Sequence, residues 1–363
     1  MRSLLDELEK ELNELRALVA SIAPVNSALK EHKDSVVRRY LTIRRRFDYA
    51  AFAVALYASF EKFLENLVAA YVRLETRRVR YNDLPPKLVR KHLFRTAEIL
   101  SRGRLGEGRY AALSELDAVK NLFECLNGAT PYNLNDMAVI AHDMNLRPSE
   151  IDGLFAAVGI EQVCERARRA DAMLDWYMAA EGLTHTPQDG VPAATITRRI
   201  ENIVERRNQV AHRGGTPVDL LGPEEMTDAT EFIEAFAKSV FAMAVARYCQ
   251  DHHVVPGKGI LLQVREGPYQ NGTIVVVDKP PERLFVGQPA FVAMESIGAR
   301  WGRIRSLRVD EARVVAIEPG HVAPNGIGIG LDFRFPKGGA LFALEADDDV
   351  VWSPSRAAAT LER

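Results

Sequence analysis

The sequence predicts a multidomain α plus β protein, with an all-α helical bundle followed by a small all-β barrel. From residue 1 to about residue 250, the apolar residues recur at helical spacing. After Pro256 the pattern changes to short runs of β-branched and aromatic residues separated by glycine and proline, which is typical of strands. We therefore expect a helical domain over residues 1–250 and a β-barrel over residues 260–352.

The first predicted helix is amphipathic and carries a short heptad seam. Its apolar residues alternate spacings of three and four: Leu5, Leu8, Leu12, Leu15, Val19 and Ile22. A seam of about three heptads favours docking on the protein's own bundle, with an independent coiled coil as the alternative. Pro24 is predicted to end this helix.

A second helix is predicted from Phe47 to about Tyr71. One continuous apolar stripe runs along it: Tyr49, Phe52, Leu56, Phe60, Phe63, Leu67 and Tyr71. The stripe predicts the central helix of the bundle. Glu61 lies beside it and is either a solvated charge or an accessory carboxylate that faces an active cleft.

Strands are predicted in the C-terminal part, where β-branched and aromatic residues cluster between turns. The clearest runs are Thr273–Val277, Ala290–Ala293 and Ala312–Ile317.

The composition fits a folded chain with a local nucleic-acid surface at most. Of the 363 residues, 47% are hydrophobic and 26% are charged, and the formal net charge of −2 excludes a histone-like basic field. A compact basic cluster is present, with Arg44, Arg45 and Arg46 as candidate RNA-binding residues. The alternative is that these arginines belong to solvated helix faces.

The cysteine spacing and the lengths of the apolar runs indicate the cell compartment. Cys125, Cys164 and Cys249 lie far apart, which offers neither a disulfide framework nor a zinc knuckle. No run reaches the roughly 18 apolar residues of a membrane span. We expect a cytoplasmic protein with no membrane partner, no cofactor and no metal site.

The residues with the strongest chemical pattern lie on a helix predicted from Ile196 to about His212. Asn208 and His212 share one face of this helix, and the long side chain of Arg207 can reach the same place. Gly214 and Gly215 are predicted to end the helix, which places His212 at its C-terminal end. The helix dipole favours the charged form of the imidazole there. His212 as a base and Arg207 as a guanidinium that stabilises the phosphate suit RNA cleavage by the 2′-hydroxyl. The simpler alternative is that His212 caps the helix and Arg207 is a solvated charge.

The string R-R-N-Q-V-A-H-R-G at 206–214 resembles the signature of the HEPN superfamily, in the form found in prokaryotic toxin and defence ribonucleases. The string Y-A-S-F-E-K-F-L-E at 57–65 is similar to the first core helix of that superfamily, and the resemblance covers about residues 40–250. It implies a homodimer with a composite cleft and metal-independent cleavage that leaves a 2′,3′-cyclic phosphate. By this resemblance Arg207 stabilises the phosphate, His212 acts as base or acid, and Asn208 positions the substrate. Arg206 is an alternative to Arg207 and a further candidate RNA-binding residue.

The C-terminal part resembles the second-domain β-barrel of translation elongation factors. The strings that carry this resemblance are L-F-V-G-Q-P-A-F-V at 284–292, R-I-R-S-L-R-V-D at 303–310, G-I-G-I-G-L at 326–331 and K-G-G-A-L-F at 337–342. No G-x-x-x-x-G-K-[ST] phosphate loop is present, so GTP hydrolysis is not expected. The resemblance implies that the barrel directs the protein to tRNA or ribosomal RNA.

Together these features predict an endoribonuclease that acts as a toxin or antiviral defence effector, with RNA as substrate and an antitoxin or defence-system protein as partner. The alternative is a non-catalytic RNA-binding or adaptor protein that uses the same fold.

Overall fold

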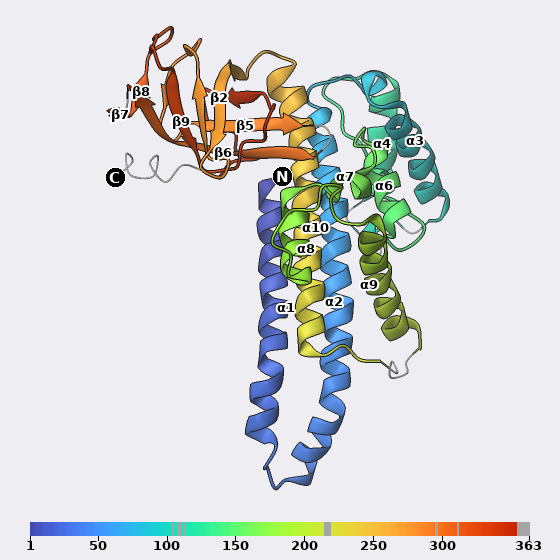
Figure 1. The fold of residues 1–363 in the computed structure, drawn as a ribbon. Coiled ribbons are helices and arrows are strands. Elements are labelled where there is room, and N and C mark those ends of the chain that lie inside the picture. The colour runs from blue at the N-terminus through green and yellow to red at the C-terminus, as the bar shows by residue number, and fades with distance from the viewer. Residues whose placement is uncertain are drawn as a thin grey trace, which may run out of the picture. The chain divides into compact units, whose positions relative to one another are not determined.

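The computed structural model describes residues 1–103, 105–106, 110–111, 113–213, 219–294, 297–310 and 312–353, and the side chains of 212 and 213 are outside this description. The chain divides into two compact units (Figure 1). The helical unit spans residues 3–240, and the second unit contains residues 241 onward together with Met1 and Arg2. Over the described residues, no helix is long and apolar enough to cross a membrane.

The predicted order of a helical part followed by strands is confirmed. The helices are α1 (Arg2–Leu29), α2 (Ser35–Glu75), α3 (Pro86–Ser101), α4 (Glu115–Leu126), α5 (Asp136–Val139), α6 (Pro148–Ala156), α7 (Val163–Ala167), α8 (Asp171–Glu181), α9 (Ala193–Arg213) and α10 (Pro223–Cys249), with a 3₁₀ turn at Tyr81–Asp83. A π-helical turn, Gln250–Val254, follows α10.

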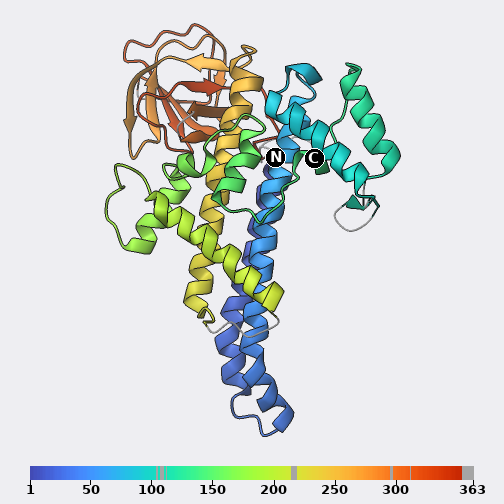
Figure 2. The ribbon, with the colours of Figure 1, turned by 90° about the vertical axis from the view of Figure 1, so that its right-hand side faces the viewer.

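The long helices α1, α2 and α10 run beside one another in the helical unit, with α9 on another side of α2 (Figures 1 and 2). The whole predicted stripe of α2 is buried, from Tyr49 to Tyr71. Asp34 caps the first turn of α2, since its carboxylate accepts the Val36 N–H at 2.7 Å. The predicted central helix is therefore confirmed, and it is longer at both ends than its apolar stripe.

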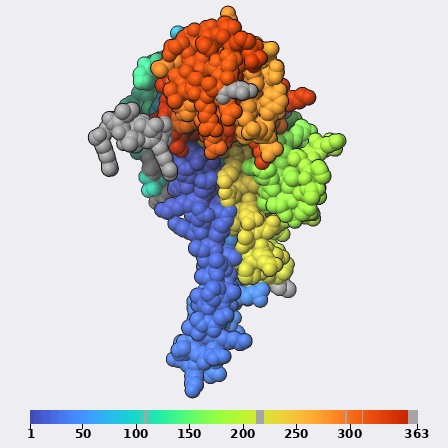
Figure 3. All heavy atoms as spheres, turned by 60° about the vertical axis from the view of Figure 1, so that its left-hand side comes forward, coloured from blue at the N-terminus to red at the C-terminus, as the bar shows by residue number. Residues whose placement is uncertain are grey.

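The α1 helix docks on the chain's own bundle, as the short seam favours. Its seam residues are buried from Leu5 to Val19. Lys62 of α2 donates to Glu7 and Glu11 of α1 at 2.6 and 2.9 Å, and Lys238 of α10 lies 3.1 Å from Glu9. The space-filling view shows α1 and α10 side by side on the surface (Figure 3).

The prediction that Pro24 ends the first helix is wrong, because α1 continues through Pro24 to Leu29. A proline removes one backbone hydrogen bond and crowds the preceding turn. Pro24 is exposed, so water can bind the carbonyl that the missing N–H leaves free.

The strands of the second unit form a nearly closed antiparallel barrel. They are β1 (Ile260–Leu262), β2 (Val264–Tyr269), β3 (Ile274–Val277), β4 (Leu284–Phe285), β5 (Pro289–Met294), β6 (Gly298–Val309), β7 (Ala312–Val314), β8 (Ala316–Ile317), β9 (Ile327–Leu331) and β10 (Leu341–Ala343). The pairing order is β1-β10-β5-β6-β9-β3-β2, with β7 on β6 and a separate β4-β8 pair. The two ends of this order, β1 and β2, are separated in sequence by Gln263 alone, so a single bent segment joins both edges.

The interior of the barrel is filled by aliphatic side chains from opposite strands, including Val275, Val292, Leu307 and Ile329. At Gly330 of β9 the neighbouring strand lies very close, because a Cβ there would be 2.4 Å from Ser306 Oγ. The predicted run Ala312–Ile317 is two short strands and not one. Val315 between them is 81% exposed, where the chain passes from pairing with β6 to pairing with β4.

Candidate functional site

The helix that carries the candidate residues packs one apolar face against the helical unit. Ile196, Ile200, Ile203 and Val204 of α9 are buried. Arg206, Arg207 and Asn208 follow on the last two turns and are half-buried. The packed face therefore fixes how these polar residues are presented.

Arg207 is held over an aromatic ring of α2. Its guanidinium carbon lies 5.3 Å from the centroid of the Tyr57 ring, a cation–π distance. Its NH1 donates a hydrogen bond to Asn208 Oδ1 at 3.2 Å. No carboxylate in the described part of the chain lies within ion-pair distance of Arg207. Within the described residues, its positive charge is therefore not paired with a carboxylate.

Asn208 joins α9 to the segment between α5 and α6. Its Oδ1 accepts a second hydrogen bond, from Asn145 Nδ2 at 3.0 Å. The next residue, Leu146, donates its backbone N–H to the Tyr57 hydroxyl at 2.9 Å, and that hydroxyl donates to Glu61 Oε1 at 2.8 Å. One polar network thus runs from Arg207 to Glu61.

Tyr57 enters this network as a neutral phenol. Burial raises its pKa well above the ordinary value, and the bonded carboxylate of Glu61 raises it further. The Leu146 N–H and the Arg207 charge act in the opposite direction and do not outweigh burial. Tyr57 therefore supports Arg207 by its ring and organises its neighbours by its hydroxyl.

Arg206, the alternative to Arg207, is held in place by protein groups. Its guanidinium donates to Tyr49 Oη at 3.1 Å, to Asn202 Oδ1 at 2.8 Å and to the Asp219 carbonyl at 3.0 Å. Its side chain is only 15% exposed. Of the two arginines, Arg207 is the one that meets Asn208.

The basic cluster of α2 splits into two kinds of arginine. Arg44 is buried and forms an ion pair with Asp48, with Nε 2.9 Å from Oδ2. Arg45 and Arg46 are exposed, and the Arg46 guanidinium lies over the Phe47 ring. An RNA contact from this helix thus suits Arg45 and Arg46 better than Arg44.

The predicted catalytic histidine lies at the last turn of α9, whose bounds include it. The side chain of His212 lies outside the described residues, as do Gly214 and Gly215. Its role therefore stays a prediction.

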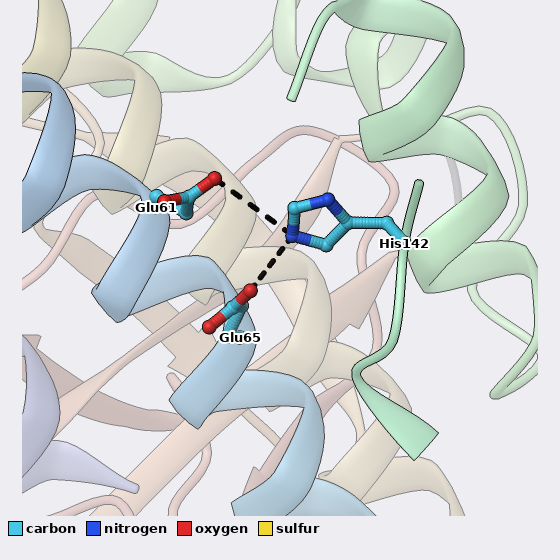
Figure 4. A group of neighbouring side chains, drawn as sticks. All are labelled: Glu61, Glu65 and His142. Carbon is cyan, nitrogen blue, oxygen red and sulfur yellow. Dashed lines mark hydrogen bonds and ion pairs between the residues drawn. The ribbon is translucent and has the colours of Figure 1, made fainter. Parts of the chain in front are cut away.

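Glu61 lies in the network and not on a solvated face. Besides the Tyr57 bond, its Oε1 lies 3.8 Å from His142 Nε2, and Glu65 Oε1 lies 2.7 Å from the same nitrogen (Figure 4). These three side chains could hold a metal ion, since their ligand atoms all lie within 4.8 Å of one another.

Sequence reasoning missed Tyr57, Asn145, His142 and Glu65 as site residues. For two of them a signal existed, because Tyr57, Glu61 and Glu65 recur every four residues and so share a helix face. Asn145 and His142 lie in an irregular segment and carry no periodic signal. Asp143, the next residue after His142, is not part of this group, because its carboxylate accepts a hydrogen bond from Arg95, with 2.9 Å between Arg95 NH1 and Asp143 Oδ1.

The RiboL-PSP-HEPN family model matches residues 6–243, which include the whole network. The chain belongs to the RiboL-PSP-HEPN family. A comparison with curated proteins finds no match. Membership of a HEPN family indicates a nuclease-type, RNA-related function at a coarse level. The likeness of the barrel to translation factors stays a prediction.

Proposed function

We propose that this HEPN-family protein is an endoribonuclease that cleaves RNA by attack of the 2′-hydroxyl on the adjacent phosphate. The observation that carries the proposal is the placement of Arg207, which is held by Tyr57 and Asn208 and pairs with no described carboxylate. A guanidinium held in place, with no carboxylate partner among the described residues, is suited to bind an RNA phosphate.

The proposed chemistry needs a base, an acid and charge stabilisation, and no metal ion in the chemical step. A base removes the 2′-hydroxyl proton, the 2′-oxygen bonds to phosphorus, and the bond from phosphorus to the 5′-oxygen breaks. The leaving oxygen takes up a proton, which gives a 2′,3′-cyclic phosphate and a 5′-hydroxyl. Arg207 stabilises the charge on the phosphorus oxygens, His212 acts as base or acid, and Asn208 positions the substrate.

The biological setting is proposed from the same resemblance. A homodimer would bring two copies of α9 to one RNA strand, so that each copy supplies one arginine and one histidine. An RNA-cleaving protein of this kind would serve as a toxin or antiviral defence effector restrained by a partner protein. Its RNA would be tRNA or ribosomal RNA, with the β-barrel contributing to that choice.

The test is cleavage of total RNA by the full-length protein in the presence of EDTA, with the new ends identified. We expect cyclic-phosphate ends, and a loss of about a hundredfold or more in Arg207→Ala and in His212→Ala. The matched control is Arg73→Ala, since Arg73 is an exposed arginine that pairs with Asp136.

Two results would contradict the proposal. Unchanged cleavage in Arg207→Ala would remove the site from the reaction. RNA binding by the unaltered protein without any cleavage would favour the non-catalytic RNA-binding or adaptor function.

A further inference from the structure

A histidine and two glutamates lie close together on the α2 face that carries Tyr57, one and two turns further along the helix. Glu61 and Glu65 lie one turn apart on α2, and the His142 ring enters from the facing segment with Nε2 between the two carboxylates (Figure 4). The side chains of His142 and Glu65 are only 9% and 14% exposed, and that of Glu61 is 28% exposed. The three groups are thus brought together where they are partly shielded from water.

Both ring nitrogens of His142 lie at hydrogen-bond distance from an oxygen atom. His142 Nδ1 is 2.6 Å from the backbone carbonyl oxygen of Met144. A carbonyl oxygen only accepts, so Nδ1 carries a hydrogen and donates it. Nε2 lies 2.7 Å from Glu65 Oε1 and 3.8 Å from Glu61 Oε1. A carboxylate oxygen also only accepts, so the shorter contact is a hydrogen bond when Nε2 carries a proton, and a metal ion bound here would take the place of that proton.

Three electron-rich atoms at these distances repel one another unless a positive centre lies between them. A second proton on the ring would supply one such centre, and a bound cation would supply another. The Nδ1–H bond to a backbone carbonyl is the arrangement that orients a metal-ligating histidine in proteins. The bond to Met144 therefore leaves Nε2 as the ring nitrogen that a metal ion would bind.

We propose that Glu61, Glu65 and His142 bind one divalent transition-metal ion of the zinc type. One imidazole nitrogen with two carboxylate oxygens suits Zn²⁺, whereas Mg²⁺ and Ca²⁺ prefer all-oxygen sites. Tetrahedral ligands about 2.0–2.1 Å from zinc lie about 3.3 Å apart. The observed separations from Nε2 are 2.7 Å to Glu65 Oε1 and 3.8 Å to Glu61 Oε1, so each carboxylate would shift by about half an ångström to reach that spacing.

The ion would fasten the segment around His142 to α2. Asn145 and Leu146, which contact Asn208 and Tyr57, lie on the same segment. This metal site does not depend on the proposed nuclease reaction, because the ion is assigned to holding the segment and not to the chemical step.

The experiment is metal binding by the full-length protein after treatment with EDTA and dialysis. Zn²⁺ alone is titrated, the bound metal is measured by mass spectrometry, and Mg²⁺ is titrated in parallel. We expect one high-affinity Zn²⁺ per chain, no comparable Mg²⁺ binding, and a thermal midpoint that rises with Zn²⁺ concentration. His142→Ala and Glu65→Gln should each weaken binding by more than about tenfold.

Two control variants separate this site from surface binding. His185→Ala removes an exposed histidine of the same unit, and Asp143→Asn removes a carboxylate adjacent to His142. Both should keep the affinity of the unaltered protein, as should Arg207→Ala, whatever its nuclease activity. The proposal is wrong if the unaltered, folded protein binds no Zn²⁺, binds Mg²⁺ equally well, or loses no affinity in His142→Ala.

Discussion

Tyr57 is the residue at which the polar network can be interrupted most cleanly. Its hydroxyl accepts the Leu146 N–H and donates to Glu61, while its ring lies under Arg207. The substitution Tyr57→Phe removes these two hydrogen bonds and a longer contact of 3.4 Å to Asn145 Oδ1, and it keeps the ring. It therefore tests the network without removing the aromatic support of the guanidinium.

The expected loss of stability follows from what the two partners lose. Leu146 is fully buried, and a buried N–H without a partner costs about 1–3 kcal/mol. The Glu61 side chain is 28% exposed, so water can replace the lost donor and this bond contributes nearer to about 1 kcal/mol. We expect Tyr57→Phe to lower the free energy of unfolding by about 3 kcal/mol, a large part of the about 5–15 kcal/mol typical of a domain.

The assay is urea unfolding at neutral pH, followed by the helical circular dichroism signal. The control is Tyr40→Phe on the same helix, because Tyr40 is 48% exposed and its substitution should change stability by less than about 0.5 kcal/mol. If Tyr57→Phe is no less stable than Tyr40→Phe, the hydroxyl does not hold the segment and the network is not structural.

Two further predictions concern a buried histidine and the basic cluster. Burial lowers the pKa of His92 from 6.5 to about 4. Between these pH values the unfolded chain binds a proton that the folded protein does not, so the free energy of unfolding is highest above about pH 6.5 and falls as the pH drops toward 4. The loss is about 3 kcal/mol in urea unfolding across that range, and His92→Gln should flatten the pH dependence; an equal slope in the variant would refute this. Arg45→Ala should weaken RNA binding and reduce the salt slope by about 0.7 without loss of stability. Arg44→Ala should instead cost about 3 kcal/mol of stability, since it leaves Asp48 unpaired, and the reverse pattern would contradict this division of roles.

The periodic parts of the sequence predict the fold well. The stripe on α2 and the seam on α1 bury the residues that their spacing indicates, because an apolar helix face must be covered. Pro24 misleads because a proline weakens a helix without always ending it. The closure of the barrel through Gln263 is beyond local pattern, since strand pairing joins residues far apart in the chain.

The candidate site is predictable only where its residues share one helix. Arg207 and Asn208 are neighbours, so their meeting follows from the sequence. The choice between Arg206 and Arg207 does not follow, because one residue turns a helical side chain by about 100° and both side chains are long. The answer depends on Tyr49 and Asp219, which come from distant parts of the chain. Both accept hydrogen bonds from the Arg206 guanidinium and so hold it in place.

One face of α2 links the proposed phosphate site and the proposed metal site, and Glu61 belongs to both. Its Oε1 accepts the Tyr57 hydroxyl and also faces His142 Nε2, so a change at Glu61 disturbs the support of Arg207 and the ligand set together. Glu65 contacts His142 and lies one turn further from Tyr57, so it reports on the ion with less effect on Arg207. A loss of RNA cleavage in a Glu61 variant therefore cannot by itself assign Glu61 to the reaction. The comparison of Glu61 with Glu65 separates a role in the support of Arg207 from a role in metal binding.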